Sequence, residues 1–122
     1  MISFENFIAE DGTPIYLQII RHMKRGIVSG IIANGDEVPS RRVLSALLGV
    51  NPNTIQKAYR ILEEETLMES RSGAKSVMSL NPDKVSKVRR ELLENDALAI
   101  VSSLKQMGLS KEEALELIRE YW

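Results

Sequence analysis

Apolar residues recur every three or four positions through the first half of the chain, which is the period of a helix with one buried face. The pattern predicts three short helices, at residues 14–29, 41–48 and 52–65. Capping or turn-forming residues bound the second and third: Ser40, Gly49, Asn51 and Pro52. The positions expected in the core are Ile15, Ile19, Ile20, Met23, Ile27, Leu44, Leu47, Leu48, Ile55, Ala58, Tyr59 and Leu62.

After residue 65 the pattern becomes typical of strands. Residues 67–71 and 76–80 are predicted as two strands, and Ser72-Gly73-Ala74-Lys75 between them as the turn of a hairpin. A short strand is expected at Val38. Three helices followed by a hairpin form a winged helix-turn-helix, which we assign to residues 1–80, with residues 1–13 as an acidic lead-in.

The last third of the chain predicts a helical hairpin. Apolar residues from Val85 to Met107 indicate a helix of about seven turns that ends at Gly108, and Ser110 with Glu113 forms a capping box for a final helix. Such a hairpin has no core of its own, so it must pack on the winged domain, on a partner, or on both. We expect residues 81–122 to form a dimerisation segment, with the interface at Val85, Val88, Leu92, Leu93, Ala97, Ile100, Val101 and Leu104.

The predicted fold class is therefore mainly α with a small β-hairpin wing, a winged helix-turn-helix followed by a C-terminal two-helix dimerisation hairpin. The chain has 122 residues, enough for one or two small domains, and no cysteine, which excludes disulfides and thiolate metal sites. We find neither a signal-peptide pattern nor an apolar run near the roughly 18 residues that span a bilayer. The expectation is a cytoplasmic protein with no membrane partner.

The net charge is −1, but the charge is unevenly distributed. Residues 14–80 carry nine Lys or Arg against six Asp or Glu, residues 1–13 carry three acidic residues, and residues 81–122 carry seven basic against eight acidic. The excess positive charge of +3 thus coincides with the predicted helix pair. This mild bias favours a nucleic-acid partner for that segment.

The third helix has the polar side expected of a helix that enters a DNA groove. Asn and Gln side chains bond adenine edges, Thr contacts phosphates or a thymine methyl, and Lys and Arg neutralise phosphates. A solvated surface face is the alternative interpretation of the same residues, which are Asn51, Asn53, Thr54, Gln56, Lys57 and Arg60.

Several motifs, in order, resemble the GntR family of bacterial transcription regulators. They are PIYLQIIRHMKRGIVSGIIANGD, then VPSRRVLSALLGVNPNTIQKAYRILEEETL, then the SRSGAKSV hairpin. The NPNT opening of the third helix and the GLSKEEALELI ending are similar to the YtrA-like subfamily. The resemblance covers nearly the whole chain.

The family resemblance implies a homodimeric repressor that binds a palindromic double-stranded DNA operator. It places Arg42 and the start and polar side of the third helix on DNA, and the wing tip, Ser72 and Gly73, near the minor groove. YtrA-like members lack a large ligand-binding domain, and whether a small-molecule effector binds is left open. The full set expected at the DNA is Ser40, Arg41, Arg42, Asn51, Asn53, Thr54, Gln56, Lys57, Arg60, Arg71, Ser72, Gly73 and Lys75.

Some positions depart from the family pattern. Thr66 replaces the usual glycine after the third helix, and because Thr tolerates positive φ poorly, we expect the chain to leave that helix by a different turn. Lys75 replaces the second glycine of the wing, where it could contact a phosphate. Arg41 stands where an apolar residue is usual, as an added cation that either binds phosphate or lies in solvent.

Other functions fit the same residues less well. Arg42 could pair with Glu37 or Glu63 rather than with DNA. A winged helix used for protein binding would expose an apolar face on the third helix, which this polar side argues against. An ending similar to a ubiquitin-associated domain would need a further helix. No enzyme, cofactor or metal is expected, since His22 is the single histidine and has no evident second ligand.

Overall fold

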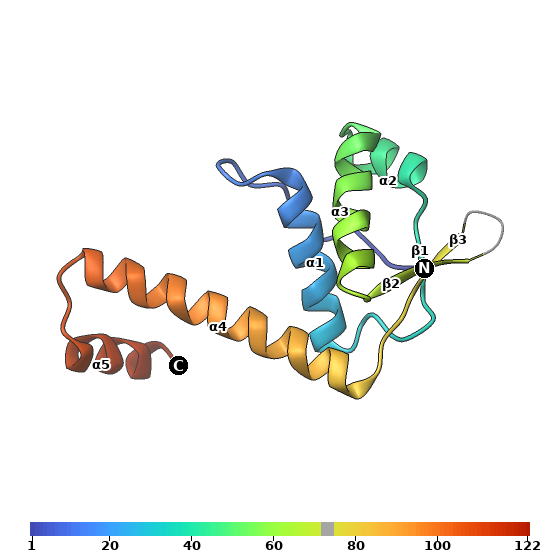
Figure 1. The fold of residues 1–122 in the computed structure, drawn as a ribbon. Helices are drawn as coiled ribbons and strands as arrows, with labels where there is room; N and C mark the ends of the chain where they lie inside the picture. The colour runs from blue at the N-terminus through green and yellow to red at the C-terminus, as the bar shows by residue number, and fades with distance from the viewer. Residues whose placement is uncertain (72–74) are drawn as a thin grey trace. The chain divides into compact units, whose positions relative to one another are not determined.

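The computed structural model describes residues 1–71 and 75–122 and divides them into two compact units, Met1–Arg89 and Arg90–Trp122 (Figure 1). The first unit holds α1 (Ile15–Ser29), β1 (Glu37–Val38), α2 (Arg41–Leu48), α3 (Pro52–Glu64), β2 (Met68–Arg71) and β3 (Lys75–Met78). The helix α4 (Pro82–Gln106) begins in the first unit and continues into the second, which also holds α5 (Lys111–Tyr121). The predicted winged helix-turn-helix is confirmed.

The core of the first unit forms around α3, which packs against α1, α2 and β2. Apolar residues recur at helical spacing on each of the three helices, so each helix turns one apolar face toward the core. The side chains buried most completely are Ile19, Met23, Ile27, Leu44, Ile55, Leu62 and Met78. The prediction for Leu47 is wrong, because this side chain is 65% exposed. The eight-residue α2 turns only one narrow face toward α3, and Leu44 occupies it.

The sheet has three antiparallel strands in the order β1-β3-β2. In this register Val77 lies between Glu37 of β1 and Glu69 of β2. The short strand predicted at Val38 is therefore confirmed as β1. β2 and β3 form the predicted hairpin, although β3 ends two residues before the predicted end. The predicted turn residues Ser72, Gly73 and Ala74 lie outside the described residues.

The C-terminal end of α3 has a left-handed residue at Thr66, with φ of 62°. The Thr66 N–H donates to the Glu63 carbonyl (2.9 Å), and the Leu67 N–H donates to the Leu62 carbonyl (2.9 Å). This is the kind of closure that usually has glycine at the left-handed position. The expectation that Thr66 forces a different turn is wrong, because the hydrogen bonds of the chain reversal hold Thr in the same conformation.

The N-terminal segment is more than an acidic lead-in. Ile2 and Phe4 are buried, and the Ile2 N–H donates to the Glu37 carbonyl (3.2 Å) beside the sheet. The Phe4 ring stacks on His22 of α1, with 4.6 Å between ring centroids, and His22 Nε2 lies 3.0 Å from the Ser3 carbonyl oxygen. The alternation of Ile2 and Phe4 was the available sequence signal. His22 thus has a packing role.

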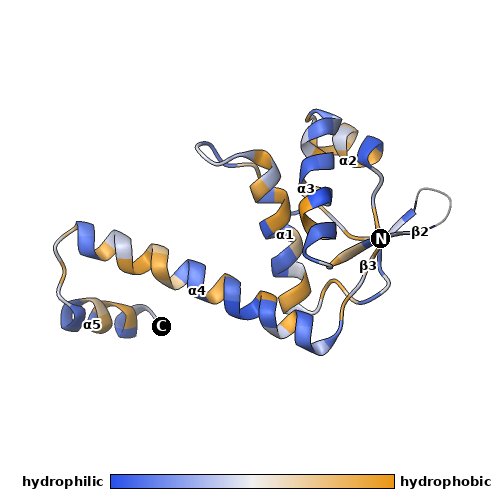
Figure 2. Cartoon of the chain, in the orientation of Figure 1, coloured by the Kyte–Doolittle hydropathy of each residue, from blue (hydrophilic) through white to orange (hydrophobic). Residues whose placement is uncertain are grey.

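The second unit consists of most of α4, the Gly108 turn (φ 80°) and α5. The Ser110 hydroxyl accepts from the Glu113 N–H at 3.2 Å, so the predicted cap of α5 is confirmed. Both helices carry apolar residues, which are the recurring orange segments among blue ones in Figure 2. Several of these side chains are exposed in the single chain.

The predicted apolar stripe of α4 divides into two faces. Val85, Val88 and Leu92 lie on one side of the helix, roughly 100° away from Leu93 and the apolar residues that follow it. Val88 is buried within the first unit, so its assignment to a dimer interface is wrong. The exposed face, named the α4 stripe below, consists of Leu93, Ala97, Ile100 and Val101 together with the half-buried Leu104.

Candidate nucleic-acid interface

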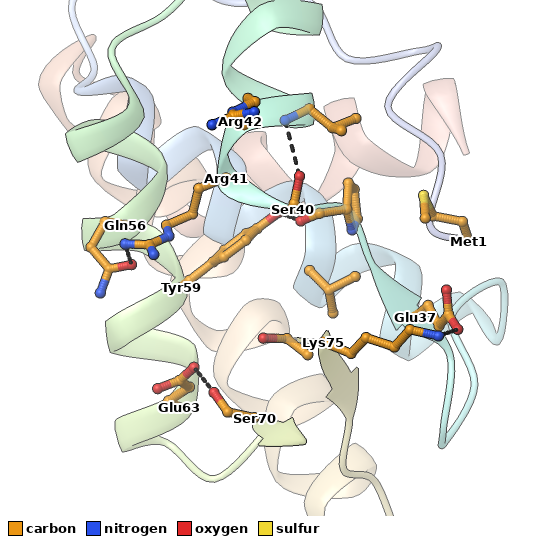
Figure 3. A pocket seen from close by; sticks show the side chains of 14 residues that line it. Met1, Glu37, Ser40, Arg41, Arg42, Gln56, Tyr59, Glu63, Ser70 and Lys75 are labelled. Atoms are coloured by element: carbon orange, nitrogen blue, oxygen red, sulfur yellow. Dashed lines mark hydrogen bonds and ion pairs between the residues drawn. The ribbon is translucent and has the colours of Figure 1, made fainter. Parts of the chain in front are cut away.

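A hollow of about 610 Å³ lies between the start of α2, one side of α3 and the wing strands (Figure 3). Basic and hydrogen-bonding side chains from all three elements meet in it. Its lining includes Glu37, Ser40, Arg41, Arg42, Gln56, Tyr59, Glu63, Ser70 and Lys75. The hollow brings together DNA-contact residues that were predicted from separate motifs.

The first turn of α2 is built to hold an anion. The Ser40 hydroxyl oxygen accepts from the Val43 N–H (3.1 Å), which leaves the hydroxyl proton available as a donor. The N–H groups of Arg41 and Arg42 belong to the first turn, where the helix supplies no acceptor. Backbone donors, the positive end of the helix dipole and two guanidinium groups thus occur together, an arrangement that suits a DNA phosphate.

Arg42 is free to contact a ligand. Among residues 1–71 and 75–122 no hydrogen bond or ion pair engages its side chain. Both alternative partners are engaged elsewhere: Glu37 lies 3.7 Å from Lys75 Nζ, and Glu63 accepts from the Ser70 hydroxyl at 3.2 Å. The alternative that Arg42 pairs with Glu37 or Glu63 is therefore wrong for this structure.

At the start of α3 the polar residues have different tasks. The Asn51 side-chain oxygen accepts from the Asn53 N–H (2.8 Å), so it serves as the helix cap. Asn53 is exposed, and Thr54 is half-buried. Arg41 reaches from α2 to α3, where its NH1 donates to Gln56 Oε1 at 2.8 Å. Asn53 and Gln56 thus present amides near the N-terminal end of the helix, while Asn51 is occupied locally.

Two further cations of α3 already have partners in the chain. The Lys57 ammonium lies 4.0 Å from the centroid of the Tyr16 ring on α1, a cation–π contact. Arg60 Nε lies 4.0 Å from Glu64 Oε1 one turn later. The structure therefore turns Lys57 toward Tyr16 of α1.

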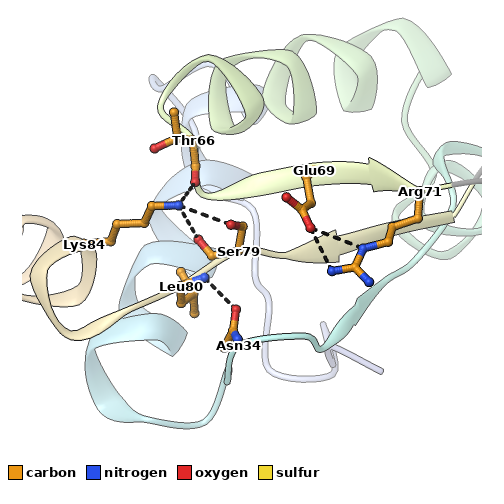
Figure 4. Close-up of polar contacts among 7 residues, drawn as sticks. All are labelled: Asn34, Thr66, Glu69, Arg71, Ser79, Leu80 and Lys84. Carbon is orange, nitrogen blue, oxygen red and sulfur yellow. Dashed lines mark hydrogen bonds and ion pairs between the residues drawn. The ribbon is translucent and has the colours of Figure 1, made fainter.

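The cations of the wing are also paired. Arg71 donates through Nε (3.2 Å) and NH2 (2.8 Å) to Glu69 Oε1, as Figure 4 shows. Lys75 pairs with Glu37 across the sheet at 3.7 Å. All four side chains are exposed, so these pairs are weak and compete with phosphate for the cations.

Tyr59 forms part of the floor of the hollow. Its ring is buried, as the sequence predicted, and its hydroxyl donates to the Pro39 carbonyl at 2.6 Å. Burial raises the pKa of this phenol well above its usual value of about 10. Tyr59 therefore stays neutral and fixes the residues that lead into α2 against α3.

Neither a metal-binding group nor a membrane-spanning helix is found among the residues that the structure describes. Within the described ranges no group of three His, Cys, Asp or Glu side chains is placed to hold a metal ion. In the same ranges no helix is both long and apolar enough to cross a membrane.

Comparison with known proteins gives a consistent result. The model of "Bacterial regulatory proteins, gntR family" matches residues 15–76. The HTH-type transcriptional repressor YtrA of Bacillus subtilis is 36% identical over 115 residues, which cover 88% of this chain and 84% of that protein. The structure of a GntR family transcriptional regulator from Listeria monocytogenes is similar with a TM-score of 0.80 and 28% identity, over 92% of this chain and 98% of the other. A structure of the AraR DNA-binding domain in complex with operator ORR3 is similar with a TM-score of 0.52 and 26% identity, over 60% of this chain and 88% of that one.

Proposed function

Because this chain belongs to the GntR family of bacterial regulatory proteins, we propose that it acts as a homodimeric repressor on a palindromic operator. It is a DNA-binding transcription regulator and not an enzyme. The observation that carries the proposal is the hollow in which the start of α2, the polar side of α3 and the wing present cations and amides to one ligand.

The proposed docking follows from the order of these elements. The N-terminal half of α3 enters the major groove, where Asn53 meets base edges. Ser40 holds a phosphate at the start of α2 together with Arg42, whose side chain has no partner in the part of the chain that the structure describes. The wing follows the adjacent backbone, with Arg71 and Lys75 exchanging their carboxylate partners for phosphates. The similarity to the AraR DNA-binding domain, which is seen in complex with operator ORR3, supports DNA binding by this domain.

The proposed dimer forms through the C-terminal helices. Residues 1–80 act as the DNA-binding domain and residues 81–122 as the dimerisation segment, with the α4 stripe at the interface. Three of its side chains, Leu93, Ile100 and Val101, are about half exposed in the single chain. A two-fold dimer presents two α3 helices to inverted half-sites, about one helical turn of DNA apart.

Repression is proposed from the name of the Bacillus subtilis relative. The spacing of the two recognition helices would be set by α4 and α5, so a signal that changes their packing would release the operator. Such a regulator works where the bacterial DNA is, in the cytoplasm. The identity of any effector is left open.

Selection of bound sequences from a random DNA pool tests the proposal. We expect inverted repeats with a centre-to-centre spacing near 10–10.5 base pairs or slightly more, and a dimer by light scattering. Asn53→Ala should lose the preference for particular bases in the selected sites, whereas Asn95→Ala on α4 should keep it. Recovery of sites without inverted symmetry, or a monomer bound to each site, would overturn the homodimer on a palindrome.

A further inference from the structure

Arg41 and Gln56 form a hydrogen-bonded pair in the hollow, and the pair determines how Gln56 is oriented. Arg41 is the first residue of α2, and Gln56 lies in the second turn of α3. The distance between Arg41 NH1 and Gln56 Oε1 is 2.8 Å. A guanidinium has only donors, so the atom that faces it must be the amide oxygen. The amide nitrogen of Gln56 points away from Arg41 in Figure 3.

The fixed orientation changes which base Gln56 recognises. A free glutamine binds adenine through both amide atoms, with the nitrogen donating to N7 and the oxygen accepting from N6. Here one of the two lone pairs of the oxygen is taken by Arg41, and the guanidinium lies beside that oxygen, so the two side chains together offer more donors than acceptors. Guanine presents two acceptors, N7 and O6, in the major groove and no donor beside them. A surface dominated by donors therefore fits guanine better than adenine.

The guanidinium of Arg41 adds donors of its own to this surface. One of its five N–H groups is used by Gln56, and the described residues contain no carboxylate bonded to it. Among the described residues the neighbouring Arg42 has no side-chain partner and is available for the phosphate, so Arg41 can serve a base instead.

We propose that Arg41 and Gln56 act as one donor-rich unit that selects guanine over adenine at one position of each operator half-site. The inference rests on the proposed function, since it assumes that α3 enters the major groove. It replaces the sequence-based expectation that Gln56 contacts adenine. Arg41 is a positioning residue for Gln56 as well as a donor.

The test uses the full chain and DNA selected from a random pool, followed by measurement on operators that differ by one G·C to A·T change. Wild type should select guanine at one symmetric position and bind it about tenfold more tightly than adenine. Arg41→Leu should release the Gln56 amide and move the preference toward adenine. Gln56→Ala should reduce discrimination at this position alone.

Three variants separate base readout from charge. Arg41→Lys keeps the charge but has a single nitrogen, so it should keep the salt dependence of binding and lose much of the guanine preference. Arg89→Leu removes a cation on α4 and should leave the preference unchanged. Thermal melts of every variant, followed by circular dichroism, establish that each is folded.

The outcomes distinguish the two ideas. If wild type selects adenine at this position, or if Arg41→Leu weakens all sequences equally without shifting the preference, the pair is not a readout unit, although operator binding stands. If wild type selects no sequence at all, the proposed function fails and the inference fails with it.

Discussion

The Lys84 ammonium lies 2.7 Å from the carbonyl oxygen of Thr66, the residue that ends α3 in the left-handed conformation (Figure 4). The same ammonium lies 3.0 Å from the Ser79 carbonyl and 3.2 Å from the Ser79 hydroxyl. One side chain from the first turn of α4 thus joins the end of the recognition helix to the chain that leaves β3. Because α3 must be held firmly to read DNA, this contact connects the stability of the first unit to its function.

Thr66→Gly should stabilise the protein. A β-branched residue in the left-handed region costs about 1–2 kcal/mol. Glycine removes this strain, but its greater conformational entropy in the unfolded chain offsets about 0.5–1 kcal/mol of the gain. We expect the free energy of unfolding to rise by about 0.5–1 kcal/mol, measured by urea denaturation. Thr66→Ala is the control and should gain less, since it keeps a Cβ. A destabilised glycine variant would show that Thr66 is not strained.

Lys84→Met should destabilise the first unit. The substitution keeps most of the side-chain stem but removes a donor shared by Thr66 and Ser79. The expected loss is about 1 kcal/mol, because hydrogen bonds to a charged group are strong but this one is partly screened by water. Lys87→Met, an exposed position on the same helix, should leave the urea midpoint unchanged. Equal urea midpoints for Lys84→Met and Lys87→Met would show that the hydrogen bonds of Lys84 do not stabilise the first unit.

Tyr59→Phe should destabilise the protein at neutral pH by about 1–2 kcal/mol, because the Pro39 carbonyl loses its buried donor. The pKa of Tyr59 is raised in the folded state, so its neutral form contributes stability that is present below about pH 10, the pKa of an unfolded tyrosine, and lost as the pH rises. The difference between wild type and variant should therefore narrow above about pH 10. Urea unfolding of both proteins at neutral pH and above about pH 10 measures this difference in the free energy of unfolding. A difference that does not change with pH would contradict the raised pKa.

Glu69→Gln should strengthen binding to all DNA. The substitution releases Arg71 from its ion pair, so the guanidinium becomes available to phosphate. Affinity should rise roughly two- to fivefold, since an exposed pair is worth about 0.2–1 kcal/mol. The slope of log K against log salt should stay nearly the same, because Arg71 contacts a phosphate in both complexes and only the cost of breaking its ion pair is removed. Glu94→Gln, which breaks a similar pair with Arg90 on α4, is the matched control. Unchanged binding by Glu69→Gln would mean that Arg71 does not reach the DNA.

Leu93→Asp with Ile100→Asp should convert the proposed dimer into monomers. Each side chain is 52% exposed in the single chain, so the monomer should stay folded. Two unpaired charges buried at an interface cost several kcal/mol and should raise the dimer dissociation constant by at least about 100-fold. Asn95→Asp with Ser102→Asp carries the same two charges at the same spacing on the opposite side of α4 and should remain dimeric. Light scattering distinguishes the two, and a folded dimer in the first variant would place the interface elsewhere.

Local chemistry explains why much of the fold was predictable. The bounds of α2 depend on Ser40 and Gly49, and the start of α3 on Asn51 and Pro52, all within a few residues of the helices that they cap. Thr66 was mispredicted because its intrinsic preference was outweighed by hydrogen bonds to Leu62 and Glu63 and by Lys84, which is distant in sequence. Val88 was misassigned because the spacing of apolar residues is the same whether they pack against their own chain or against a partner.

By itself the sequence determined the elements, their order and the family resemblance, and it supplied a predicted set of DNA-contact residues, since periodicity, caps and motifs are local properties. The tertiary structure decided how those residues are used. Packing α2 against α3 places Arg41 beside Gln56, pairing β1 with β3 brings Glu37 to Lys75, and packing α1 on α3 sets Tyr16 under Lys57. These pairings join residues far apart in the chain, and only the packing of helices and strands brings their charges and hydrogen-bonding groups within reach of one another.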